Sequence, residues 1–209
     1  MKLSKIKREA VVAELIGTFF LALAVLASLH GAVILLPTAV IAGLTLGLGV
    51  LVIGHISGSH INPAVTIGLY SLRKIDGVNA LAYILAQLVG GLLAMVAMSM
   101  FKDGILVAQV DAVADYKTFF AEFLGAFAFT FGIAAAVHQK LKGIDAALAI
   151  GGSLTLGILF ASIASNGVLN PVVATSISSL NWAYVLGPIL GSIIAMNIYA
   201  LSFGKKGRI

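Results

Sequence analysis

The sequence predicts an all-α membrane protein, with six transmembrane helices and two half-length helices arranged as an inverted repeat. Three observations carry this prediction. First, 60% of the 209 residues are hydrophobic and 10% are charged, which is more apolar surface than a water-soluble domain can hide. Second, the charged residues are grouped, with long uncharged stretches between the groups. Third, two sequence motifs recur in the second half of the chain at one common spacing.

Six apolar stretches are long enough to cross a bilayer, which takes about 20 residues in a helix. No Lys or Arg lies between Arg8 and Arg73, or between Lys142 and Lys205, so each interval has room for more than one crossing. The expected spans cover residues 10–29, 36–56, 79–100, 118–138, 145–164 and 182–203.

Two shorter apolar segments, 62–71 and 170–179, each begin with an Asn-Pro pair and are too short to cross a bilayer. Proline is favoured in the first turn of a helix, and asparagine just before it is a good N-cap. We therefore expect each segment to be a half-length helix that is capped by its asparagine, Asn62 or Asn170.

Lysine and arginine are distributed unequally over the loops, which predicts the orientation because they favour the cytoplasmic side of a membrane. Lys102 and Lys117 lie in the loop between the third and fourth spans. The other eleven lie at the termini or in loops on the opposite side: Lys2, Lys5, Lys7, Arg8, Arg73, Lys74, Lys140, Lys142, Lys205, Lys206 and Arg208. We expect an integral protein of the plasma or inner membrane with both termini in the cytoplasm.

The chain repeats itself. AELIGTF at 13–19 matches AEFLGAF at 121–127, and INPAV at 61–65 matches LNPVV at 169–173, with a shift of 108 residues in both cases. Two motifs at one shift indicate a duplication. Each half contains three spans, an odd number, so the halves must enter the membrane from opposite sides.

The repeat predicts a single channel domain over 1–209, with halves of about 1–108 and 109–209. Non-helical backbone at membrane depth is tolerated where protein surrounds it or a wet cavity adjoins it. Two half-helices entering from opposite faces would meet near the middle, each presenting unpaired N–H groups and about half a positive charge. We expect a narrow passage that repels cations, with a centre formed by Asn62, Pro63, Ala64, Asn170, Pro171 and Val172.

The chain resembles the aquaporins of the major intrinsic protein family. SGSHINPAVTIG at 57–68 is close to the family's first signature loop, and AELIGTFFL and AEFLGAF resemble its two helix-start signatures. The resemblance covers essentially the whole chain. It implies an hourglass of six helices and two half-helices, a pore in each subunit, a homotetramer, and passive conduction of water or small neutral solutes with exclusion of protons.

The resemblance also implies roles for single residues. Asn62 and Asn170 would be the central donors, and the buried carboxylates Glu14 and Glu122 would brace the two loops. An intramembrane carboxylate is expensive without hydrogen-bond partners, which agrees with that role. Backbone carbonyls would line the pore at Gly58, Ser59, His60 and Ile61 in the inner half, and at Asn166, Gly167, Val168 and Leu169 in the outer half.

The second loop departs from the family pattern, which usually reads Asn-Pro-Ala-Arg, because Val173 stands in the place of the arginine. Counting from the two asparagines places the other filter positions at Ala42, Ile158 and Gly167. This filter is uncharged, and we expect a wide outer mouth that admits glycerol, urea, ammonia or undissociated metalloid hydroxides. The opposite outcome is a constriction apolar enough to dewet and close.

Other classes of function find less support. The chain has no cysteine, no phosphate-binding loop and no catalytic triad pattern, so we expect neither an enzyme nor a cofactor. His55 and His60 have no third ligand nearby in the sequence, and we expect no metal site. The basic residues are scattered over short loops and termini and form no single face, so we expect no nucleic-acid partner. The expected partners are the lipid bilayer, because of the apolar spans, and small neutral permeants. The alternatives are an inverted-repeat secondary transporter, which needs an ionisable substrate site, and a non-conducting membrane scaffold or adhesion protein.

Overall fold

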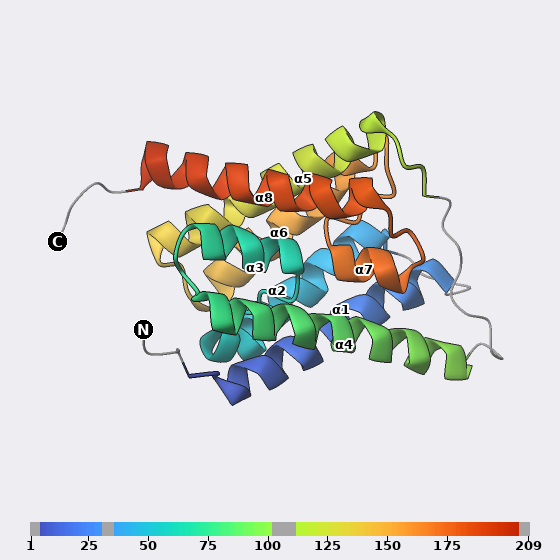
Figure 1. The fold of residues 1–209 in the computed structure, drawn as a ribbon, viewed down its shortest axis with the longest axis horizontal. Helices are drawn as coiled ribbons and strands as arrows, with labels where there is room; N and C mark the ends of the chain where they lie inside the picture. The colour runs from blue at the N-terminus through green and yellow to red at the C-terminus, as the bar shows by residue number, and fades with distance from the viewer. Residues whose placement is uncertain (1–4, 31–35, 102–111, 205–209) are drawn as a thin grey trace.

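The computed structural model describes residues 5–30, 36–101 and 112–204, and these residues form helices with no strand among them (Figure 1). The predicted all-α membrane fold is confirmed. In chain order the helices are α1 (Arg8–His30), α2 (Thr38–Ser57), α3 (Pro63–Ser71), α4 (Gly77–Phe101), α5 (Tyr116–Gln139), α6 (Gly143–Ala161), α7 (Pro171–Ser176) and α8 (Trp182–Phe203).

Six of these helices have 19 to 25 residues and are apolar enough to cross a membrane. They match the six predicted spans to within about three residues at each end. The largest difference is at α6, which ends at Ala161, three residues before the predicted end. There the backbone tightens into turns, since Ala164 N donates to Ala161 O at 3.1 Å and ends the regular helical pattern.

The half-helices α3 and α7 lie in line between α8 and α4, and they enter from opposite ends of the bundle (Figure 1). α7 is shorter than the predicted segment 170–179 because a Schellman motif ends it early. Ser178 adopts a left-handed backbone conformation with φ 59°, and Ser179 N donates to Ala174 O at 2.8 Å. This motif cannot be read from the sequence because serine is not the usual residue at the left-handed position.

Membrane helices have no hydrophobic driving force between them, so they associate through close packing. Small residues at the crossings let the long helices approach closely. At the crossing of α2 and α6, a Cβ atom on Gly151 would collide with the carbonyl oxygen of Gly43. At the crossing of α5 and α8, a Cβ on Gly187 would lie 2.8 Å from Phe119 O. These crossings hold the bundle around the two half-helices.

The start of α1 and the end of α8 lie at the same end of the bundle, as an even number of crossings requires (Figure 1). Several basic residues on which the predicted orientation rests lie outside the described residues, namely Lys2, Lys102, Lys205, Lys206 and Arg208. The loop residues Arg73, Lys74, Lys140 and Lys142 are described and exposed or half-buried.

Candidate functional site

The tips of the two half-helices touch at the centre of the bundle through a reciprocal pair of hydrogen bonds. Asn62 Nδ2 donates to Leu169 O at 2.9 Å, and Asn170 Nδ2 donates to Ile61 O at 3.0 Å. Each bond joins residues more than 100 positions apart in the chain. Both asparagines are buried, so this contact fixes the two loops relative to each other.

Each asparagine also caps its own half-helix, as the sequence predicts. Asn62 Oδ1 accepts from Ala64 N at 2.8 Å, and Asn170 Oδ1 accepts from Val172 N at 3.0 Å. These bonds assign the oxygen of each amide, so the nitrogen is the atom that faces the opposite loop. An amide nitrogen carries two hydrogens, and the contact between the tips uses one of them. Each asparagine therefore retains a second donor at the centre.

Glu14 fixes the first loop by accepting hydrogen bonds at both of its carboxylate oxygens. Oε1 accepts from Ser57 Oγ at 2.6 Å and from His60 N at 2.9 Å, and Oε2 accepts from Ile61 N at 2.6 Å and Gln87 Nε2 at 2.8 Å. Glu14 is fully buried. Hydrogen bonds to a charged group are stronger than neutral ones, and four of them compensate for the burial of the carboxylate.

Glu122 holds the second loop in the same way, 108 residues later in the chain. Oε1 accepts from Ser165 Oγ at 2.7 Å and from Val168 N at 2.9 Å, and Oε2 accepts from Leu169 N at 2.7 Å. The backbone of Leu169 is left-handed with φ 57°, as is that of its counterpart Ile61 with φ 40°. This conformation turns their N–H groups toward the carboxylates and their carbonyls toward the facing asparagine.

A polar network that the sequence analysis missed sets the protonation pattern of the His60 ring. Thr66 Oγ1 donates its single hydrogen to Asn62 O at 3.1 Å and accepts from Gln87 Nε2 at 3.0 Å. The ring atom His60 Nδ1 lies 3.2 Å from the same hydroxyl oxygen. Since the hydroxyl hydrogen is directed at Asn62 O, this contact fits the tautomer in which Nδ1 is the donor and Nε2 is left as an acceptor.

One signal in the sequence could have indicated this network. Gln87 is an uncharged polar residue in the middle of the apolar span 79–100, and polar groups at that depth usually face the bundle interior. It is fully buried and bridges Glu14 to Thr66. Tyr83, one helical turn earlier, packs edge-on against the ring of His60 with ring centroids 5.2 Å apart.

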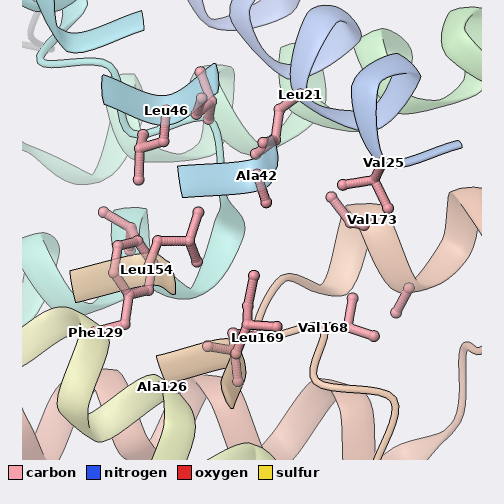
Figure 2. Close-up of a cluster of buried hydrophobic side chains, with 14 of the residues drawn as sticks. Leu21, Val25, Ala42, Leu46, Ala126, Phe129, Leu154, Val168, Leu169 and Val173 are labelled. Carbon is pink, nitrogen blue, oxygen red and sulfur yellow. The ribbon is translucent and has the colours of Figure 1, made fainter. Parts of the chain in front are cut away.

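A cavity of about 270 Å³, called here the apolar hollow, extends from the two asparagines toward the far end of α1. The four predicted filter residues, Ala42, Ile158, Gly167 and Val173, all lie on its wall. Val25, Ala42, Leu154, Phe129 and Val173 of its wall come from α1, α2, α6, α5 and α7 and face one another in the cluster of buried side chains in Figure 2. The volume exceeds the roughly 30 Å³ of one water molecule several-fold, so the hollow can hold a solute of several heavy atoms.

The wall of the apolar hollow carries no charged side chain in the part of the chain that the structure describes. Most of its residues are aliphatic, and the hydroxyl of Ser162 donates to Ile158 O at 2.7 Å. At the inner end, the amides of Asn62 and Asn170 are available as donors to a solute. The other wall residues are Leu21, Val25, Leu29, Pro37, Thr38, Ala39, Leu46, His60, Ile61, Phe129, Leu154, Leu159, Asn166, Val168 and Ile177.

A second cavity, of about 300 Å³, opens at the end of the bundle where α1 begins. It is called here the basic mouth, and its wall includes Lys7, His55, Arg73 and Lys74. His60 lies on the wall of both cavities, so its ring stands between them.

The predicted pore residues divide into two groups. His60, Ile61, Asn62, Asn166, Gly167, Val168 and Asn170 lie on the apolar hollow, and Gly58 lies on the basic mouth. Neither wall includes Ser59, Pro63, Ala64, Leu169, Pro171 or Val172, which lie behind them in the described structure. The carbonyls of Ile61 and Leu169 are both occupied by the asparagine amides. Within the described residues, no group of three or more His, Asp or Glu side chains could hold a metal ion.

Comparison with known proteins agrees with this architecture. The family model described as "Major intrinsic protein" matches residues 2–199. The chain belongs to the major intrinsic protein family. It is therefore an integral membrane protein of a family of passive channels for water and small solutes, and the members of this family are not enzymes.

Curated relatives of this major intrinsic protein include plant aquaporins. It is 30% identical over 204 residues to Aquaporin NIP3-1 of Oryza sativa subsp. japonica, covering 90% of this chain and 66% of that protein. It is 30% identical over 207 residues to Nodulin-26 of Glycine max, covering 91% of this chain and 76% of that protein. The chain thus spans about two thirds to three quarters of these relatives.

The crystal structure of the aquaglyceroporin from Plasmodium falciparum has the same fold. It superposes with a TM-score of 0.70 at 21% identity, covering 92% of this chain and 95% of that chain. At this identity the likeness concerns the fold alone.

Proposed function

We propose that this major intrinsic protein is a passive channel for small uncharged solutes, with an uncharged selectivity filter formed by Ala42, Ile158, Gly167 and Val173. The observation that carries the proposal is the apolar hollow, which leads to the two central asparagines and has no charged side chain on its described wall. Val173 lies on that wall where the family pattern has arginine.

In this proposal a solute crosses the apolar hollow, is hydrogen bonded by Asn62 and Asn170, and passes His60 into the basic mouth. The asparagines present donors and His60 Nε2 presents an acceptor, so a solute with hydroxyl or amide groups is satisfied on both sides of the centre. Cations are repelled by the positive ends of α3 and α7. Without an arginine, these two helix ends carry that repulsion at the centre of the bundle.

The expected solutes are glycerol, urea, ammonia and undissociated metalloid hydroxides. When a carbon-containing solute enters an aliphatic cavity, its free-energy cost of leaving water is smaller than that of a water molecule, because part of the solute's surface is apolar. One relative is named as an aquaporin and one structural neighbour is described as an aquaglyceroporin. Both names agree with a channel whose solutes are small and uncharged.

We further propose that the chain acts as a single channel domain of two halves, about 1–108 and 109–209, and assembles as a homotetramer with a pore in each subunit. Both termini would lie in the cytoplasm of the plasma or inner membrane. The distribution of Lys and Arg over the loops supports this orientation, and family membership supports the tetramer.

Osmotic swelling of proteoliposomes in water, glycerol and urea tests the proposal. Val173→Arg would restore a fixed cation in the hollow, and we expect it to lower glycerol and urea flux at least tenfold while retaining water flux. Val173→Met is the matched control, since it adds a long side chain without charge and should lower glycerol flux much less. If Val173→Arg leaves glycerol flux unchanged, the filter assignment is wrong, and if wild-type vesicles swell no faster than empty ones in any solute, the channel proposal is wrong.

A further inference from the structure

The basic mouth has a strongly unequal charge. Three basic side chains, Lys7, Arg73 and Lys74, lie on the wall of one cavity of about 300 Å³, together with the ring of His55. Lys7 comes from the segment before α1, and the two others from the turn after α3, 66 residues later. Cations converging from distant parts of a chain raise the local concentration of anions.

The turn that carries two of these cations has a fixed backbone. Arg73 occupies the left-handed position of a Schellman motif at the end of α3, with φ 56°. Its N–H donates to Tyr70 O at 2.9 Å, and Lys74 N donates to Leu69 O at 2.9 Å. Both hydrogen bonds of the motif are therefore formed, and the two side chains start from a defined point on the wall.

Asn79 forms hydrogen bonds with the backbone of Lys7 and with the carboxylate of Asp76, and both of these residues lie on the wall of the basic mouth. This buried side chain accepts from Lys7 N at 3.0 Å and donates to Lys5 O at 3.3 Å. Asp76 Oδ1 accepts from Asn79 N at 3.0 Å, and Asp76 Oδ2 accepts from Asn79 Nδ2 at 2.7 Å. Asp76 is the one carboxylate on the described wall, so three cations face a single negative charge that is already hydrogen bonded.

The basic mouth meets the apolar hollow at His60, which lies on the wall of both cavities. Its floor includes Ser57, Gly58 and His60, and beyond His60 lies the apolar hollow. An anion that moved past His60 would leave its cations for a cavity without a charged partner on the described wall, and burial of an unpaired charge is strongly unfavourable. An anion is therefore attracted to the basic mouth and stopped at its floor.

We propose that the basic mouth binds a small oxyanion of the phosphate class and that the bound anion blocks the passage at His60. Arg73 supplies a guanidinium fork that matches a phosphate edge, and Lys7 and Lys74 supply point charges. The anion could be free phosphate or the phosphomonoester headgroup of a lipid, since both present the same chemistry. The blocking step rests on the proposed channel function, whereas the binding step does not.

Two measurements test the two steps. Calorimetric titration of the solubilised protein with sodium phosphate, against sodium chloride at equal ionic strength, measures binding. Glycerol-driven swelling of proteoliposomes with and without phosphate on both sides measures block. Vesicles that contain phosphatidic acid, compared with phosphatidylcholine alone, distinguish the lipid headgroup from free phosphate, because a headgroup in the mouth would lower flux without added phosphate.

The variant is Arg73→Asn with Lys74→Gln, which removes two charges and keeps a residue that tolerates the left-handed backbone. The matched control is Lys140→Asn with Lys142→Gln, because Lys140 also has a left-handed backbone, with φ 58°, and neither lysine lies on the wall of the basic mouth. We expect the first pair to raise the half-blocking phosphate concentration at least about tenfold, since charged hydrogen bonds are lost. The control pair should leave it unchanged.

The outcomes separate the inference from the proposed function. The anion site is wrong if the wild type does not bind phosphate, or if the control pair weakens the phosphate effect as much as the first pair does. Binding with unchanged flux overturns the block and supports the site. Wild-type vesicles with no solute flux at all would overturn the channel function, and the calorimetric titration would still decide the binding step.

Discussion

Replacing Glu122 by glutamine should destabilise the protein by about 3 kcal/mol. The carboxylate accepts three hydrogen bonds, two at Oε1 and one at Oε2 from Leu169 N at 2.7 Å. A glutamine oxygen can keep the bonds from Ser165 and Val168, but its NH2 group then faces the Leu169 N–H. One charged hydrogen bond is lost and a buried donor is left without an acceptor, at about 1.5–3 kcal/mol for the bond alone.

Thermal unfolding in detergent, followed by circular dichroism, measures this loss. For a chain of 150–250 residues, 1 kcal/mol corresponds to about 2–4 °C, so Glu122→Gln should lower the midpoint by roughly 6–12 °C. Glycerol flux should fall as well, because Leu169 also carries the carbonyl that receives Asn62. The matched control is Glu9→Gln, which neutralises an exposed carboxylate in the first turn of α1 and should change the midpoint by less than about 2 °C.

A midpoint within about 2 °C of wild type for Glu122→Gln would refute this reasoning. It would mean that the second loop keeps its shape without the carboxylate, and that the hydrogen bond at Oε2 contributes little. Equal shifts for Glu122→Gln and Glu9→Gln would point to general surface or net-charge effects instead.

Three further predictions concern other parts of the fold. Gly151→Ala should lower the thermal midpoint by several degrees because its Cβ collides with the carbonyl of Gly43, whereas Gly152→Ala, with nothing within 4 Å, should be tolerated; equal effects would contradict the crossing of α2 and α6. Gln87→Met should lower glycerol flux and lower stability by about 1–3 kcal/mol, because two buried hydrogen bonds are lost; unchanged unfolding would show that the network around His60 is not needed. Asp115 caps α5, and the hydrogen bond from the Thr118 N–H holds the pKa of its carboxyl below the usual value. The stabilisation is present above the unfolded pKa near 4 and is lost as pH falls through the lower folded pKa, so Asp115→Ala should destabilise at pH 7 and lose its effect at acid pH below the folded pKa, as thermal unfolding at a series of pH values would measure.

Much of the fold could be predicted because the signals are local. The six spans follow from runs of apolar residues, and the starts of α3 and α7 follow from Asn-Pro pairs whose caps reach only two residues ahead. The length of α7 could not be predicted in this way. Its end depends on Ser178 taking a left-handed backbone conformation, which the residue type does not favour and the surrounding helices impose.

The candidate site likewise combines features that the sequence predicted with features that depend on contacts between distant residues. The shift of 108 residues in the sequence indicated that two asparagines and two glutamates are equivalent. It did not indicate which atoms they bind across the bundle, since those partners are 43 to 109 residues apart. The polar network of Thr66 and Gln87 is of this kind, because it joins α3 to α4 and has no counterpart in the second half, where Ala195 stands 108 residues after Gln87.

The sequence by itself determined that this chain spans a membrane, that it is a duplication, and that its half-helices begin at capped prolines. Those properties depend on composition and on contacts within about one helical turn. Only the tertiary structure decided that Val173 shares a wall with Ala42 and Ile158, that His60 presents its Nε2 as an acceptor, and that Lys7 meets Arg73 in one cavity. The reason is that these arrangements depend on how helices from distant parts of the chain pack, which no local pattern encodes.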